Sequence, residues 1–275
     1  SGWLAEDITL ARNFKYRWFN NEIKTKEDFN FNRKKDFVIL PEIFAHLADD
    51  LLIKHNISYS IFVQNGYCLD STNNETLLIK AYKNAKFILS SSEDTSECIK
   101  LRFSRLKLKI IKVFYSIEVG LVNYKNKKNI ITYTNRKLSH HSNLVISFLK
   151  PQLPKNWYLK NLNNLSYKNY LKELKKSRIF LSFSNLEGLG LPPAEAALAG
   201  NYVIGYTGES GKEYWIKPLF TEINSGEIKN FVLNIITRIN SKEKFSKKNY
   251  NKLKKKFSEE NKVNQIKKIL KIINN

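Results

Sequence analysis

Short apolar runs alternate with amphipathic segments along most of the chain, and each kind of segment predicts one kind of element. Runs of mostly apolar residues are typical of strands buried on both faces of a sheet. They predict strands at 36–41, 59–64, 86–90, 109–115, 130–134, 157–159, 178–183 and 202–206. Apolar residues at helical spacing predict helices at 42–55, 75–82, 95–103, 138–149, 167–175 and 192–200. The alternation predicts an α/β fold with parallel sheets.

A polar, lysine-bearing stretch at 123–129 interrupts this alternation. We therefore expect two consecutive α/β units, an N-terminal domain over 1–120 and a C-terminal domain over 121–275. Residues 1–35 have no clear period and carry no assignment. In open parallel sheets, ligands bind at the carboxyl ends of the strands. Candidate functional residues are therefore expected in the loops that follow the predicted strands.

The C-terminal region, about 225–275, is basic and predicts helices. Its apolar residues recur at roughly helical spacing: Phe245, Tyr250, Leu253, Phe257, Val263, Ile266, Ile269, Leu270 and Ile273. Such a stripe either packs on the rest of the fold or lies on a membrane surface. Packing on the fold is the interpretation we favour.

The loop after the strand at 178–183 carries the most informative pattern. Residues 184–196 read SNLEGLGLPPAEA, and the proline pair at 192–193 predicts the first turn of a helix. A helix N-terminus presents free N–H groups and the positive end of its dipole to an anion. Glycines in the loop let the main chain approach a ligand closely. This segment therefore predicts an anion site.

Two carboxylates, Glu187 and Glu195, bracket that site. Phosphate groups would take the N–H groups, and carboxylates accept hydrogen bonds from ribose or sugar hydroxyls. A nucleotide sugar has both kinds of group. The alternative is a plain helix cap with two solvated glutamates, but a cap alone does not require this pattern.

Residues 187–200 read EGLGLPPAEAALAG, and a short apolar strand follows. This stretch resembles the EX7E motif of retaining GT-B glycosyltransferases of the glycogen-synthase-like, family-4 type. The resemblance is strongest over about 130–215. It implies two Rossmann-like domains with the ligand in the cleft between them, here with a short or truncated N-terminal domain. It also implies that the last helices cross back to the first domain.

The resemblance implies a role for each residue of the motif. Glu187 is the candidate catalytic residue, and with the N–H groups of Gly188, Leu189 and Gly190 it would orient the donor sugar. Glu195 would hold the ribose hydroxyls. Retention in this family is described as front-face attack, in which a donor phosphate oxygen receives the proton of the acceptor. No separate protein base is then expected.

Arg136 and Lys137 follow the strand at 130–134. In the family that this chain resembles, a basic pair at this place grips the donor diphosphate. An arginine fork fits phosphate oxygens, and a lysine adds positive charge beside the leaving group. Among 47 basic residues a coincidental pair is easy to find, but its position directly after a strand favours the donor site.

Three further loops supply possible site residues. Gly208 and Glu209 lie in a second glycine-bearing loop after a strand and would edge the sugar or phosphate pocket, unless this loop is a plain turn. His46 and Asn65 stand where acceptor-side loops of the first domain would lie. His46 matches no fixed motif, so a structural role is the better interpretation of this residue.

No Asp-x-Asp triplet occurs, so we expect no metal and no cofactor other than the nucleotide sugar. The acceptor is expected to be a carbohydrate or a lipid-linked glycan. The sequence contains no run that predicts a transmembrane helix and no signal peptide at its start. A cytoplasmic protein is therefore expected, with possible peripheral contact to an anionic membrane at its inner face.

The formal net charge of +22 leaves other partners to consider. Lysines spread over many segments indicate a solvated surface more than a dedicated polyanion site. Three functions remain open: a glycosyltransferase, which we favour, a nucleotide-binding GT-B-like module without transferase activity, and a nucleic-acid-binding protein. The last ranks lowest because no recognised nucleic-acid-binding motif is present.

Overall fold

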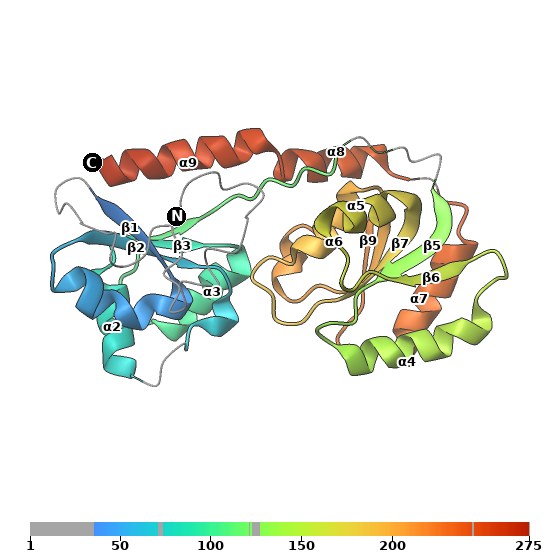
Figure 1. Ribbon diagram of the computed structural model, residues 1–275, viewed down its shortest axis with the longest axis horizontal. Helices are drawn as coiled ribbons and strands as arrows, with labels where there is room; N and C mark the ends of the chain where they lie inside the picture. The colour runs from blue at the N-terminus through green and yellow to red at the C-terminus, as the bar shows by residue number, and fades with distance from the viewer. Residues whose placement is uncertain (1–35, 71–73, 121, 123–126, 244, 275) are drawn as a thin grey trace.

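The computed structural model describes residues 36–70, 74–120, 122, 127–243 and 245–274. Figure 1 shows two lobes side by side, each built around one sheet, with the C-terminal helices running across both. All paired strands are parallel in both sheets. The predicted α/β fold with two parallel sheets and a helical C-terminal region is confirmed.

The N-terminal lobe has a four-stranded sheet in the order β1-β2-β3-β4. Its strands are β1 (Phe37–Pro41), β2 (Ser58–Val63), β3 (Ile88–Ser90) and β4 (Ile110–Lys112), and its α-helices are α2 (Glu75–Asn84) and α3 (Glu93–Arg102). Buried side chains of α2 and α3, among them Leu78, Tyr82 and Ile99, pack on one face of this sheet. β4 is shorter than the predicted strand at 109–115.

The segment predicted as one helix over 42–55 is different in the structure. It forms a 3-10 helix, η2 (Glu42–Leu47), followed by a short π-helical segment, η3 (Asp49–Ile53). Glu42 and Ala45 of η2 are both buried. Residues three apart eclipse one another in a 3-10 helix, so this winding turns both of them inward.

The C-terminal lobe has a five-stranded sheet in the order β6-β5-β7-β8-β9. Its strands are β5 (Lys128–Tyr133), β6 (Tyr158–Asn161), β7 (Ser177–Phe183), β8 (Tyr202–Tyr206) and β9 (Phe220–Glu222), and its α-helices are α4 (Ser139–Leu149), α5 (Tyr167–Lys176), α6 (Leu191–Leu198) and α7 (Ile228–Asn240). Two short 3-10 helices, η6 (Lys150–Gln152) and η7 (Ser210–Glu213), complete this lobe. β9 was not predicted. The predicted boundary between 120 and 121 falls between β4 and β5.

Helices cover both faces of this second sheet. Ile179 and Leu181 of β7 pack against α4 and α7, whereas Phe180 packs with α5 and α6 on the other face. Strands buried on both faces read as continuous apolar runs. This explains why the run at 178–183 predicted β7 correctly.

The last two helices tie the lobes together. α8 (Lys247–Lys256) places Leu253 in the core of the C-terminal lobe, and α9 (Glu259–Asn274) places Ile269 on Phe87 and Leu89 of the N-terminal lobe. Figure 1 shows α9 lying along the N-terminal lobe. The predicted packing of the apolar stripe is confirmed at Leu253 and Ile269. Among the residues that the structure describes, no helix has the length and apolar character needed to cross a bilayer.

Candidate functional site

The loop between β7 and α6 has the conformation that the sequence predicts. α6 begins at Leu191 with prolines in its first turn, and Gly190 before it has a φ of +71°. This left-handed conformation favours glycine. The hydroxyl of Tyr214 donates to Gly190 O at 2.5 Å. The hydrogen bond fixes the end of the loop against the C-terminal lobe.

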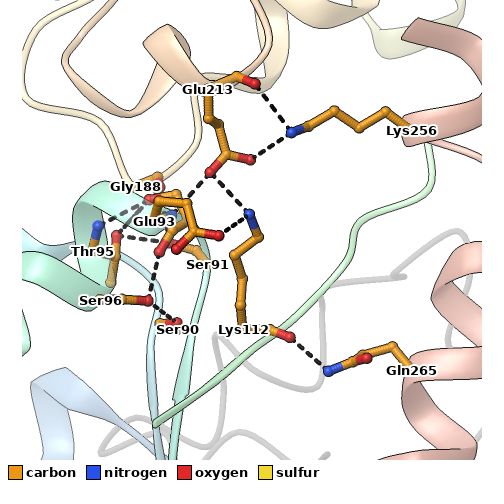
Figure 2. A network of polar contacts seen from close by, with 11 residues as sticks. Ser90, Ser91, Glu93, Thr95, Ser96, Lys112, Gly188, Glu213, Lys256 and Gln265 are labelled. Atoms are coloured by element: carbon orange, nitrogen blue, oxygen red, sulfur yellow. Dashed lines mark hydrogen bonds and ion pairs between the residues drawn. The ribbon is translucent and has the colours of Figure 1, made fainter. Parts of the chain in front are cut away.

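The main chain of the two lobes meets closely at Gly188. A Cβ atom on Gly188 would stand 1.6 Å from Gln64 O of the N-terminal lobe. Gly188 O lies 2.9 Å from Ser91 Oγ and 3.3 Å from Thr95 Oγ1, and both hydroxyls can donate to it (Figure 2). Asn65 Nδ2 donates to Leu186 O at 3.0 Å. The candidate residue Asn65 therefore holds this loop across the cleft.

A cavity of about 120 Å³ lies between this loop and the end of β5. Its lining comprises Thr134, Arg136, Lys137, Phe180, Ser182, Phe183, Ser184, Glu187, Pro192 and Pro193. The structure thus brings together the predicted basic pair and the first glutamate of the motif. The cavity also lies at the carboxyl ends of β5 and β7, where open parallel sheets bind ligands.

This cavity has more positive than negative side chains, Arg136 and Lys137 against Glu187. Lys137 Nζ lies 2.5 Å from Glu187 Oε1, and the Glu187 side chain is 18% exposed. Arg136 is exposed and forms no salt bridge with any part of the chain that the structure describes. One positive charge is therefore left over beside the start of α6, where the positive end of the helix dipole also favours an anion.

Glu195 does not line this cavity. It lies on α6 one turn beyond Pro192, and Tyr167 at the start of α5 donates to its Oε1 at 3.0 Å. Burial raises the pKa of Glu195, and the hydroxyls of Tyr167 and Tyr170 oppose this rise. The second glutamate of the motif is thus a partly buried acceptor between α5 and α6.

The second glycine-bearing loop lies directly beside Glu187. Glu187 N donates to Gly208 O at 3.0 Å, and a Cβ on Gly208, where φ is +66°, would stand 2.8 Å from Glu187 Cγ. Glu209 pairs with Lys212 at 2.7 Å. A further cavity of about 120 Å³ is lined by this loop and by Ser184. Gly208 and Glu209 therefore lie beside Glu187 and line this further cavity, not the cavity that holds Arg136 and Lys137.

His46 is not brought into the cleft. It lies in η2, its Nδ1 is buried without a hydrogen-bond partner among the described residues, and it lines neither of these two cavities. Glu42, at the start of the same 3-10 helix, contacts a candidate site residue. The buried Glu42 carboxylate accepts a hydrogen bond from Asn65 N at 3.1 Å, and burial raises its pKa. The buried side of a 3-10 helix gave no signal for this contact in the sequence.

A polar network between the two lobes was also missed by sequence reasoning (Figure 2). Glu213 of η7 accepts a hydrogen bond from Glu93 N at 2.9 Å, at the N-terminus of α3. Its carboxylate also pairs with Lys112 at 3.3 Å and with Lys256 of α8 at 3.2 Å. Gln265 of α9 donates to Lys112 O at 2.7 Å. These contacts join both lobes and both C-terminal helices.

Within residues 36–70, 74–120, 122, 127–243 and 245–274, no three His, Cys, Asp or Glu side chains gather as a metal site requires. The positive charge at the candidate site comes from Arg136, Lys137 and the start of α6.

No protein-family model matches the chain, and no curated protein sequence matches it. Its fold is similar to solved structures of low sequence identity. A sucrose-phosphate synthase from Thermosynechococcus elongatus matches with a TM-score of 0.66 at 11% identity, over 86% of this chain and 73% of that one. A UDP-forming α,α-trehalose-phosphate synthase from Burkholderia xenovorans, in complex with glucose-6-phosphate, matches with 0.66 at 8% identity, over 88% and 73%.

The pneumococcal O-GlcNAc transferase GtfA, in complex with UDP and GlcNAc, matches with a TM-score of 0.62 at 15% identity. That match covers 90% of this chain and 58% of the transferase, so the chain spans less than two thirds of that relative. These neighbours are glycosyltransferases of the GT-B type. The comparisons therefore establish that this chain has the GT-B fold.

Proposed function

We propose that this protein is a glycosyltransferase that moves a sugar from a nucleotide-diphosphate sugar to an acceptor. The observation that carries the proposal is the cavity in which Arg136 and Lys137 meet Glu187 at the first turn of α6. A diphosphate needs cations and N–H donors, and a sugar needs carboxylate acceptors. Cations and a carboxylate are present within one cavity of the C-terminal lobe, at the start of α6.

Each residue has a role in the proposed reaction. Arg136 and Lys137 stabilise the negative charge that develops on the departing diphosphate. Glu187 and the main chain of Gly188, Leu189 and Gly190 orient the donor sugar, and Glu195 holds the ribose hydroxyls. The acceptor oxygen forms its bond to the anomeric carbon on the face from which the diphosphate leaves. Attack on this face retains the configuration of the anomeric carbon. The proton of the acceptor passes to a donor phosphate oxygen, and no metal ion takes part.

The partners follow from the same chemistry. The ligands named with the similar structures, UDP, GlcNAc and glucose-6-phosphate, support a nucleotide-sugar donor and a carbohydrate acceptor. A lipid-linked acceptor would bring the protein to a membrane. Three exposed apolar residues of α9, Val263, Ile266 and Leu270, lie among lysines and favour peripheral contact with an anionic surface.

A thermal-shift titration tests donor binding. The ligands are UDP, GDP, ADP, CDP, dTDP and their common sugar conjugates, because a ligand that binds only the folded state raises its melting temperature. We expect a rise for one nucleotide class. Glu195→Ala should weaken that binding by about tenfold or more, because ribose hydroxyls lose their charged acceptor. Glu97→Ala, which removes an exposed carboxylate on α3, is the matched control.

Turnover separates the enzyme from a module that only binds nucleotide. A transferase should hydrolyse its donor slowly even without acceptor, and Arg136→Gln should lower this rate. A protein that binds the nucleotide but never releases sugar would be a binding module. No shift with any nucleotide, or an unchanged shift in Glu195→Ala, would overturn the proposed donor site.

A further inference from the structure

The C-terminal lobe has another cavity, at the amino ends of the strands of its sheet. Its volume is about 190 Å³, and its lining comprises Lys127, Arg178, Ile179, Gly200, Tyr202, Arg238, Ile239, Ser241, Glu243 and Phe245. Lys127 precedes β5, Arg178 is near the start of β7, and Tyr202 begins β8. Because these strands are parallel, the cavity lies at their amino ends, whereas the candidate donor site lies at the carboxyl ends. We call it the amino-end cavity.

Positive charge dominates the amino-end cavity. Its lining contains Lys127, Arg178, Arg238 and one carboxylate, Glu243, which pairs with Arg238 at 2.8 Å. With Lys127 protonated, two positive charges are left uncompensated. A phosphate monoester carries about −1.5 to −2 charges near neutral pH, which matches this excess.

The cationic side chains are held in place by contacts with the fold. Arg238 stacks over Tyr202 with its Cζ 4.2 Å from the ring centroid, and its side chain is only 14% exposed. Arg178 donates to Lys127 O at 3.2 Å and lies over Trp157. A guanidinium carries five N–H donors, so each arginine has donors beyond those it uses here. Two pre-positioned forks are suited to phosphate oxygens.

Lys127 is the most buried of the three cations. It is 8% exposed, and its Nζ donates to Leu174 O at 2.9 Å and to Ala199 O at 2.5 Å. Burial lowers its pKa to about 7. Burying a protonated lysine costs free energy unless an anion or carbonyl groups stabilise its charge.

We propose that the amino-end cavity binds a small phosphate monoester, separately from the donor nucleotide. At about 30 Å³ for a water molecule in the liquid, the cavity has room for about six waters. This volume fits a phosphoryl group on a short carbon skeleton. The rings of Tyr202 and Phe245 pack edge to face with their centroids 5.9 Å apart. They supply an apolar wall for that skeleton. Arg178 is exposed and marks the entrance.

Isothermal titration calorimetry at about 0.15 M salt tests the proposal, because this ionic strength screens the long-range attraction of a basic surface. The probes are inorganic phosphate, glycerol 3-phosphate and ribose 5-phosphate, and glycerol and glycerate are the control ligands that lack the phosphoryl group. We expect a phosphate monoester to bind and neither control ligand to bind. Arg178→Gln and Arg238→Gln should each weaken binding by about tenfold, because each removes a charge-assisted contact.

Three further variants make the result specific to this cavity. Glu243→Gln should tighten binding by about threefold, since it removes the opposing carboxylate. Arg105→Gln, on an exposed position of the N-terminal lobe, and Arg136→Gln, in the candidate donor cavity, should leave binding unchanged. Loss of binding in Arg136→Gln but not in Arg238→Gln would place the phosphate at the donor cavity and overturn the proposal. Failure of every phosphate to bind below about 10 mM would overturn it as well.

Discussion

At the scale of single residues, Gly188 shows how one position can set the distance between two lobes. Its missing Cβ lets the loop approach Gln64 O, and its own carbonyl faces Ser91 and Thr95. Any side chain at this position would meet backbone, which cannot move as a flexible side chain does. The contact between the lobes at this loop therefore depends on glycine.

Replacing Gly188 tests this dependence. Gly188→Ala should force the lobes apart at this loop, at a cost of about 1–3 kcal/mol for the overpacked contact. Small-angle scattering should report a larger radius of gyration, and chemical denaturation a lower free energy of unfolding. Gly226→Ala is the control for the radius of gyration, because nothing lies within 4 Å of the added methyl; its φ of +90° lowers the stability of that variant without moving the lobes. An unchanged radius in Gly188→Ala would contradict this account of the interface.

Lys127 makes stability depend on pH in a definite direction. Its pKa of about 7 in the folded chain lies below the ordinary 10.5. Between these two values the unfolded chain binds more protons, so the free energy of unfolding rises with pH. Below about pH 7 both states are protonated and the cost of the buried charge is complete. The two carbonyl acceptors of Nζ reduce that cost.

Urea denaturation near pH 7 and pH 9.5 measures this effect. The wild-type chain should gain about 1–3 kcal/mol from Lys127 over this interval. Lys127→Met should remove that part of the rise, whereas Lys128→Met, at the exposed neighbouring position, should keep it. Equal pH dependence in the two variants would mean that the Lys127 ammonium is not destabilised by burial.

At the scale of elements, the sequence predicted those whose pattern matches their burial. β7 has apolar side chains on both faces, and α6 carries a proline pair in its first turn, so both were found. The segment at 42–55 was misassigned because an apolar face at mixed spacing does not distinguish an α-helix from 3-10 and π turns. β9 was missed because three residues, Phe-Thr-Glu, form no apolar run.

The packing of α9 on the N-terminal lobe can be tested with two adjacent residues. Ile269 is 7% exposed against Phe87 and Leu89, whereas Leu270 is 50% exposed. Ile269→Ala should destabilise the docked helix by about 2–4 kcal/mol through lost burial and the cavity left behind. Leu270→Ala should change little. Hydrogen exchange of α9 amides is the measurement, and similar protection in both variants would contradict the docking.

At the scale of the whole molecule, the closed arrangement of the lobes depends on residues that have no pattern in the sequence. Arg136, Lys137 and Glu187 could be predicted because each lies beside a strand or within a recognisable motif. Glu213, Glu93 and Lys112 could not, because each reads as an ordinary surface charge until the fold brings them together. A site in a cleft between two lobes is therefore only partly visible along one chain.

Glu213 should control how firmly the lobes close. Its carboxylate is 12% exposed, caps α3 of the opposite lobe and faces Lys112 and Lys256. Glu213→Gln preserves size but removes the charge, which should cost about 1–3 kcal/mol at this partly buried site. We expect a larger radius of gyration by small-angle scattering and weaker donor binding. Raising the salt concentration should shift the wild-type protein in the same two directions, because salt screens the pairs that Glu213 forms with Lys112 and Lys256.

The matched control for Glu213→Gln is Glu227→Gln, because the exposed carboxylate of Glu227 accepts its hydrogen bonds from Asn224 and Asn230 of its own lobe. That variant should keep the radius and the donor affinity of the wild type. If Glu213→Gln weakened donor binding without a change in radius, the carboxylate would act on the loop at Gly188 through α3 and not through lobe closure. If neither quantity changed, Glu213 would contribute nothing to closure, and other contacts between the lobes, such as those of Gly188 and Asn65, would hold them together.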